Sequence, residues 1–215
     1  IVFFNKVALS EAFMWTGHCQ LQNKSWHTRN YIRQGDEKLL LSVPVGRDFG
    51  QSIAATKTLD GPWRRKHLRS IEQAYQGRPF FKDYFPYLVQ LIEWKDFTSL
   101  GEMNKAICET MFDWFDIETD ILDSQDFEIT GHKNDMLASM CANAQCSDYL
   151  SNEGSRAYVD EAYLAGLGVR HRWQRFTHPI YDQGRPFIPN LSAIDLLFNC
   201  GPESGRIIRE AGHVD

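Results

Sequence analysis

A short helix with both ends marked in the sequence constrains this chain most. Ser192 is predicted to cap its first turn, and Asp195, three residues later, is placed to accept a hydrogen bond from the backbone N–H of the cap. Gly201 supplies the left-handed residue that comes after many helices, and the proline after it cannot continue one. These signals predict a rigid helix over residues 193–200, able to hold the polar, aromatic loop over residues 177–192 in place.

Apolar residues at strand and helix spacing predict the remaining elements. Strands are expected over residues 12–15, 19–21, 29–32, 39–43, 127–129, 148–150 and 169–175, and helices over residues 63–76, 80–94, 98–115, 132–144 and 156–167. Strands and helices alternate in the second half, as in βαβ units, which favours a mostly parallel sheet covered by helices. We therefore expect an α/β fold, Rossmann-like in its strand–loop–helix order, with residues 1–215 forming a single domain.

The composition argues against several classes of protein. Hydrophobic residues make up 43% of the chain, enough for the core of one domain. The net charge of −5 argues against a general nucleic-acid binder, which needs a basic surface to neutralise phosphates. No apolar run approaches the roughly 18 residues that span a bilayer, and no signal peptide is recognisable, so we expect no membrane partner and a cytoplasmic location. Five cysteines without zinc-like spacing are expected to be reduced thiols, and no metal site is predicted.

The stretch around the capped helix is similar to a known family. It contains His-Pro-x-Tyr-x-Gln from His178, Phe-x-Pro-x-Leu-Ser from Phe187 and Asp-Leu-Leu-Phe-Asn-x-Gly from Asp195. Further agreement lies in Lys-Ser-Trp-x-x-Arg from Lys24 and Trp-x-x-Lys-His from Trp63. With these motifs the chain resembles the WbqC-like family nearly from end to end. That family is known mainly from gene clusters that build O-antigens and related surface sugars, so the resemblance implies a role in polysaccharide biosynthesis.

Two departures from the family pattern bear on the site. Family members usually begin with a strand and a Gln-Pro-x-Tyr-x-Pro-Trp-x-Gly segment, and residues 1–6 of this chain resemble the residues that come directly after that segment. The resemblance thus implies that this amino-terminal strand and loop are missing here. Family members also commonly carry an Asp-Asp pair where this chain has Gly17 and His18, so a role of those carboxylates is not expected.

The candidate site residues come from these motifs. His178 is the candidate general base, because a positioned histidine accepts a proton from an amine, and Tyr181 and Gln183 are candidates for orienting the substrate. Lys24 and Arg29 are suited to hold a diphosphate, with arginine offering two parallel donors. The full set is His178, Tyr181 and Gln183 as catalytic residues, and Lys24, Trp26, Arg29, Lys66, His67, Ser192 and Asp195 as substrate-binding residues. We expect them to line one cleft.

These assignments have structural alternatives. In the alternative interpretation, Ser192 and Asp195 only cap the helix. His178 and Tyr181 then satisfy backbone groups in a closed loop, and Trp26 is only an anchor in the core. The fold must decide between the two interpretations, because an unpaired buried polar group costs about 1–3 kcal/mol and needs some partner in either.

Two functions fit this set of residues. The first is modification of an activated, nucleotide-linked sugar by a transferase, with acyl or aminoacyl transfer to an amino sugar. The alternative is a ligand-binding or assembly protein of the same pathway, because no carboxylate pair, triad or metal motif stands on its own spacing. A third function, nucleotidyl transfer, would need a phosphate-binding signature that the sequence lacks. The predicted partner is a small molecule, a nucleotide sugar, while the sequence identifies neither a cofactor nor an oligomeric state.

Overall fold

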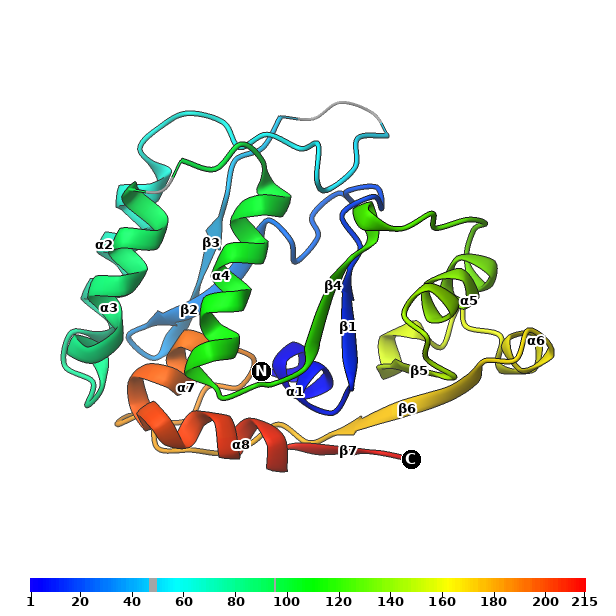
Figure 1. The fold of residues 1–215 in the computed structure, drawn as a ribbon. Helices are drawn as coiled ribbons and strands as arrows, with labels where there is room; N and C mark the ends of the chain where they lie inside the picture. Colours follow the sequence, from blue (N-terminus) through cyan, green and yellow to red (C-terminus); the bar gives the residue numbers. More distant parts are fainter. Residues whose placement is uncertain (47–49, 95) are drawn as a thin grey trace.

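The computed structural model describes residues 1–46, 50–94 and 96–215, which form helices and short strands (Figure 1). The helices are α1 (Val2–Ala8), α2 (Trp63–Tyr75), α3 (Phe81–Val89), α4 (Leu100–Trp114), α5 (Asn134–Asn143), α6 (Glu161–Gly166), α7 (Ala193–Cys200) and α8 (Ser204–Glu210), and the strands are β1 (Ala12–Trp15), β2 (Arg29–Gln34), β3 (Glu37–Ser42), β4 (Asp120–Asp123), β5 (Asp148–Ser151), β6 (Arg170–Phe176) and β7 (Gly212–Val214). The π-helical segment η1 (Gln90–Trp94) continues α3, and the shorter 3₁₀ segments are η2 (Ser124–Asp126), η3 (Glu153–Ser155) and η4 (Gly201–Glu203). The expected α/β class is confirmed.

Within the described residues the strands form three small sheets, whereas their order along the chain predicts one mostly parallel sheet. β1 pairs in parallel with β4, β2 and β3 form an antiparallel hairpin, and β6 lies between a parallel β5 and an antiparallel β7. The hairpin is antiparallel because Gly35 and Asp36 alone join its strands, and parallel strands need a long crossover. The pairs β1–β4 and β5–β6 have such crossovers, so parallel pairing is present but divided between two sheets.

Helix α7 lies inside the largest hydrophobic core, and its predicted bounds are confirmed. The side chains of Leu196, Leu197 and Phe198 are fully buried. The Phe198 ring lies 5.2 Å, between centroids, from that of Tyr75 in α2. Gly201 ends the helix with a φ of +53°, as its sequence position predicts. The helix therefore joins α2, α3 and the amino-terminal helix α1 through shared apolar contacts.

The predicted side-chain cap at the start of α7 is wrong. Ser192 occupies the cap position, but its side chain makes no capping hydrogen bond, and its backbone N–H donates to the Tyr31 carbonyl of β2 over 2.7 Å. The Asp195 carboxylate accepts from the Tyr181 hydroxyl and not from the cap. Contacts with β2 and the preceding loop therefore fix this helix start, a tertiary effect that local spacing does not reveal.

Other predicted elements differ at their ends or are not formed. The strand predicted over residues 19–21 is reduced to one bridge between Gln20 and Ser52, and the strand predicted over residues 127–129 is replaced by β4, which lies earlier in the chain. The chain also continues past Gly201 into α8 and β7, neither of which the local signals predict. Pro202 does not stop it, because proline is tolerated in the first turn of a helix, here η4.

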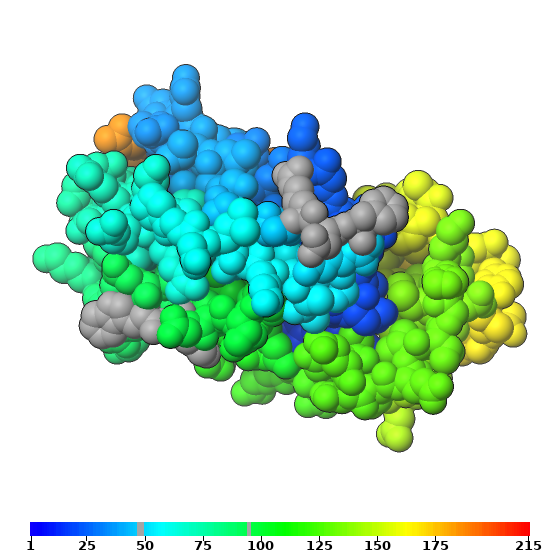
Figure 2. Space-filling view, turned by 90° about the horizontal axis from the view of Figure 1, so that it is seen from above, coloured from blue at the N-terminus to red at the C-terminus, as the bar shows by residue number. Residues whose placement is uncertain are grey.

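Strands β1 and β5 each have an unpaired edge within the described part of the chain. β1 pairs with β4 alone and β5 with β6 alone, and residues of both strands line one cavity. Seen from above, dark blue atoms of the amino-terminal segment are visible between the cyan segment that leads into α2 and the yellow-green region of α5 and α6 (Figure 2). Residues of both parallel pairs therefore line the same cavity.

Candidate functional site

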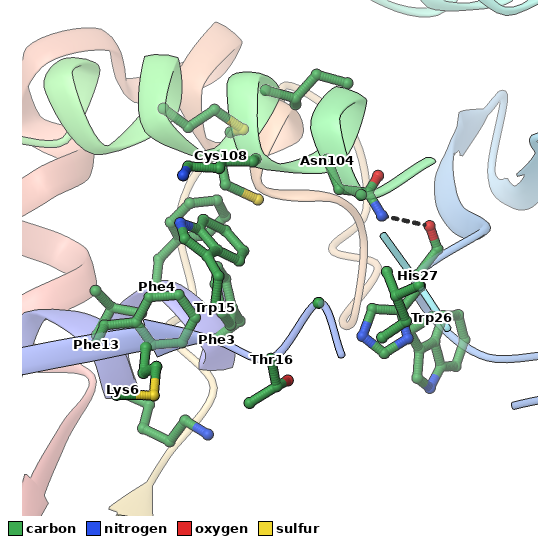
Figure 3. Close-up of a pocket in the computed structure, with 18 of the residues that line it drawn as sticks. Phe3, Phe4, Lys6, Phe13, Trp15, Thr16, Trp26, His27, Asn104 and Cys108 are labelled. Carbon is green, nitrogen blue, oxygen red and sulfur yellow. Dashed lines mark hydrogen bonds between the residues drawn. The ribbon is translucent and has the colours of Figure 1, made fainter. Parts of the chain in front are cut away.

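The candidate site is a cavity of about 1450 Å³, lined by α1, β1, β2 and α4 and by the facing α5 and β5. Aromatic side chains of α1 and β1 gather on one side of it, among them Phe3, Phe13 and Trp15 (Figure 3). Trp26 and His27, from the loop before β2, lie across from them. Ligand pockets commonly measure about 300–1,000 Å³, so a ligand of ordinary size occupies only part of this cavity.

Arg29, the first residue of β2, lies on the cavity wall and has an unpaired hydrogen-bond donor. Its Nε is buried and has no hydrogen-bond partner among the described residues. The guanidinium lies over the Trp26 ring, 5.2 Å from its centroid, while Trp26 itself is 65% exposed. An arginine with an unused donor beside an open aromatic face is suited to a ligand that joins an anionic group to a flat ring.

His67 and Ser192 reach the cavity beside Arg29. Arg29 pairs with Ser42 in the β2–β3 ladder, and the His67 ring of α2 lies near the Ser42 backbone. Burial lowers the pKa of His67 below its usual value, although the contact with Ser42 opposes that shift. Ser192 is held at the same strand through Tyr31. The start of β2 thus gathers a cation, a neutral histidine and a hydroxyl.

Lys6 adds a second cation to the wall, on the side of α1. Burial lowers the pKa of its amine, and no salt bridge of Lys6 is formed with the described residues. Elsewhere on the same wall, the indole Nε1 of Trp15 is buried and has no acceptor among the described residues. Lys6 and Trp15 lie on the same side of the cavity but apart from each other (Figure 3), and an anion on that side would satisfy the Lys6 amine.

Polar side chains close the end of the cavity where the parallel strands β1 and β4 finish. Asn104 of α4 donates to the His27 carbonyl over 2.8 Å, which ties the loop before β2 to α4. Lys105 and Asp123 form an ion pair at 3.2 Å. Burial lowers the pKa of His27, so its ring is neutral at neutral pH. Ligands of open α/β sheets characteristically bind at such carboxyl ends of strands.

In the loop before α7, Ser192 lines this cavity but His178 does not, and both ring nitrogens of His178 contact backbone groups. Its Nδ1 contacts the Pro179 carbonyl at 2.9 Å, and its Nε2 accepts from the Asn190 N–H at 3.1 Å. Burial lowers the pKa of His178, which suits this neutral arrangement. Both ring nitrogens are therefore used in closing the loop.

Three other predicted site residues, Tyr181, Gln183 and Asp195, are buried and belong to one hydrogen-bond network. The Tyr181 hydroxyl donates to Asp195 over 2.7 Å, and Gln183 accepts from Arg33 of β2 over 2.7 Å. Burial raises the pKa of Asp195 despite the donated hydrogen bond. Arg78 adds a hydrogen bond to the Gln183 carbonyl. This network fastens the loop to β2 and α7.

The ten predicted site residues are therefore divided. Trp26, Arg29, His67 and Ser192 line the cavity. His178, Tyr181 and Gln183 belong to its supporting loop, to which Asp195 of α7 is bonded, and Lys24 and Lys66 are exposed outside the cavity. Sequence reasoning missed Lys6, His27 and Asn104. The signals present in the sequence are the position of His27 inside the Lys24 motif and the placement of Asn104 on the same face of its helix as Cys108, four residues on.

Cys108 adds no reactive thiolate to the wall. All five cysteines are free thiols, and burial raises the pKa of Cys108, on the cavity wall, to about 12. Within the described residues, no group of three His, Cys, Asp or Glu side chains is placed to hold a metal ion. No described helix has the length and apolarity needed to cross a membrane.

Comparison with known proteins places the chain in a family. The family model described as WbqC-like protein family matches residues 1–207. An uncharacterized protein of Mycobacterium tuberculosis is 28% identical over 213 residues, which are 96% of this chain and 91% of the relative. No solved structure matches the chain.

Proposed function

Because the chain belongs to the WbqC-like protein family, we propose that it modifies an activated, nucleotide-linked sugar for surface polysaccharide biosynthesis in the cytoplasm. The proposed reaction is acyl or aminoacyl transfer to the amine of an amino sugar. The sugar nucleotide binds in the cavity, and the acyl group arrives on a thioester or ester donor.

The observation that carries this proposal is the unsatisfied Arg29 guanidinium on the cavity wall. The Arg29 guanidinium forms no ion pair with the described residues, and a phosphate oxygen gives it an anionic partner through a charge-assisted hydrogen bond. The exposed face of Trp26 next to it offers a stacking surface for the base or the sugar ring. Arg29 therefore binds the diphosphate, and Trp26 selects a ligand with a ring beside it.

His67 is the proposed general base. Its lowered pKa keeps the ring neutral at neutral pH, and a neutral imidazole has one ring nitrogen that can accept a proton. The amine nitrogen forms a bond to the acyl carbonyl carbon, and the bond from that carbon to the leaving sulfur or oxygen breaks. His67 takes the amine proton and returns it to the leaving group, so the histidine ends neutral.

The loop before α7 positions Ser192 in this proposal. His178, Tyr181, Gln183 and Asp195 keep the loop closed, and Ser192 contacts the ligand from its place beside Tyr31. Lys24 and Lys66, which are exposed, attract the anionic ligand from solution by charge alone.

Binding is tested by calorimetric titration with UDP-glucosamine and with inorganic diphosphate. We expect Arg29→Ala to weaken UDP-glucosamine at least about tenfold, because a hydrogen bond to a charged group contributes about 1.5–3 kcal/mol. Arg65→Ala is the matched control, since Arg65 is an exposed arginine of α2 outside this cavity. Equal affinities of wild type and Arg29→Ala would remove the ground for the proposal.

A second function, ligand binding without chemistry, is favoured by the occupied nitrogens of His178 and the protonated thiol of Cys108. His67→Gln separates the two. An enzyme loses turnover of UDP-glucosamine with acyl-CoA or aminoacyl donors, measured by mass spectrometry, while its affinity is retained. A binding protein shows no product with the wild type and the same affinity in both.

A further inference from the structure

One nitrogen and two sulfur atoms that could bind a metal lie close together near the end of β1, outside the cavity described above. His18 Nε2 lies 3.4 Å from Met136 Sδ and 3.6 Å from Cys19 Sγ. The other ring nitrogen, Nδ1, lies 2.7 Å from the hydroxyl of buried Ser124. His18 and Cys19 come shortly after β1, whereas Met136 is in the first turn of α5, 118 residues after His18.

Hydrogen bonding alone does not explain why these three atoms lie together. With Nδ1–H donating to Ser124, the lone pair of Nε2 points toward two sulfur atoms, and a thioether has no proton to give. Sulfur is in addition a weak partner in such bonds. The hydrogen bond from Nδ1 to a fixed acceptor is instead the contact that orients a metal-binding histidine and sets its tautomer.

The distances from His18 Nε2 to each sulfur atom fit a single small ion. Metal–nitrogen and metal–sulfur bonds of about 2.0 and 2.3 Å, as known for zinc, place two ligand atoms about 3.7 Å apart at a trigonal angle. The separations from Nε2 to the two sulfur atoms are close to this value. Thiolate and thioether sulfur atoms are soft ligands that suit copper(I) rather than magnesium or calcium, and structural zinc sites almost always have four ligands where only three are present here among the described residues.

We propose that Cys19, His18 and Met136 form a three-coordinate copper(I) site that joins the loop after β1 to α5. Binding forms Cu–Sγ, Cu–Nε2 and Cu–Sδ bonds, and the Cys19 thiol releases its proton to solvent. No change in oxidation state is involved. The site is independent of the proposed sugar modification, because none of its ligands is among the residues assigned to that reaction.

Copper(I) affinity is measured without oxygen, in competition with the chromophoric chelator bathocuproine disulfonate. We expect one ion per chain, and a loss of at least about tenfold in affinity in Cys19→Ser and in Met136→Leu. Met136→Leu conserves volume, so its fold is expected to persist, and urea unfolding checks each variant. Cys146→Ser is the matched control, because Cys146 is another half-buried thiol near the cavity and is expected to leave the affinity unchanged.

X-ray absorption at the copper edge tests the ligand set directly. The expected first shell is one nitrogen and two sulfur atoms, and Met136→Leu should lose one sulfur. The proposal is overturned if wild type and Cys19→Ser bind copper(I) equally, if Cys146→Ser abolishes binding, or if the shell contains sulfur without nitrogen. If Cys19→Ser does not fold, the spectra of the wild type and of Met136→Leu still test the proposed ligand set.

Discussion

The hydroxyl of Tyr181 donates a 2.7 Å hydrogen bond to Asp195, a fully buried carboxylate on α7. The donor lies in the loop after β6, and the acceptor lies one turn into the helix that this loop leads to. Because Ser192 of the same connection is bonded to Tyr31 of β2, the contact holds the supporting loop of the cavity against two elements at once.

We predict that Asp195 makes the stability of the protein fall as the pH rises. Burial raises the pKa of Asp195 in the folded state, so the carboxyl binds a proton more tightly there than in the unfolded chain. Its stabilising contribution is present below the unfolded pKa and is lost as the pH rises through the folded pKa. The difference in unfolding free energy, wild type minus Asp195→Asn, should therefore be larger at about pH 4 than at about pH 7. Urea unfolding at both values measures it, and a difference that grows with pH contradicts the prediction.

Gln183 is predicted to contribute as much to the free energy of unfolding as an apolar core residue, although its side chain is polar. Its side-chain oxygen accepts from Arg33 and from the Ile188 N–H. Gln183→Leu keeps the volume but leaves these buried donors unpaired, at about 1–3 kcal/mol for each. We expect a loss of at least about 2 kcal/mol, the lower end of that sum. Gln73→Leu, at an exposed position of α2, is the control and should change stability by less than about 0.5 kcal/mol. Equal unfolding midpoints in urea for the two variants would count against the network.

The sequence predicts those features of the fold that result from interactions between residues close together in the chain. The bounds of α7 result from Gly201 and from apolar spacing, and both act within the helix itself. Its start does not, because Ser192 and Asp195 are bonded to Tyr31 and Tyr181 in other segments. The division into small sheets is likewise a matter of strand pairing over long separations, which no local pattern encodes.

The candidate site divides in the same way. Trp26 and Arg29 line the cavity and lie in one motif with Lys24, but the backbone at Lys24 has a φ of +53°, and the turn leaves its side chain exposed. For His178, residue type alone predicts a base. Whether its nitrogens are free depends on Asn190, twelve residues away, and only the fold shows that contact.

Gly205 of α8 is predicted to tolerate no side chain. A Cβ atom built there would lie 2.1 Å from the Phe115 carbonyl oxygen, and backbone cannot move aside as a flexible side chain does. We expect Gly205→Ala to lower the unfolding free energy by at least about 2 kcal/mol, in the range of core overpacking. Gly166→Ala is the control, because no atom lies within 4 Å of its added Cβ. A Gly205→Ala variant as stable as Gly166→Ala would show that α8 is not packed against the end of α4.

The unpaired edge of β1 gives the last prediction. The Asp120 N–H donates to the Glu11 carbonyl, so residues 11, 13 and 15 direct their backbone groups toward β4. Ala12 and Met14 then direct theirs toward the cavity, where no described strand pairs with them.

Hydrogen exchange measured by NMR should therefore alternate along this strand. The amides of Ala12 and Met14 should exchange at least about tenfold faster than those of Phe13 and Trp15, because a backbone amide that is not hydrogen-bonded exchanges without the strand having to open. The expected alternation is independent of overall stability, since all four amides belong to one strand and unfold together. Protection of Ala12 and Met14 equal to that of their neighbours would mean that another segment pairs with this edge, and the wall of the cavity along β1 would then be covered. Ligand binding at Arg29 provides the internal comparison: UDP-glucosamine should protect amides at the start of β2 and leave the alternation along β1 unchanged.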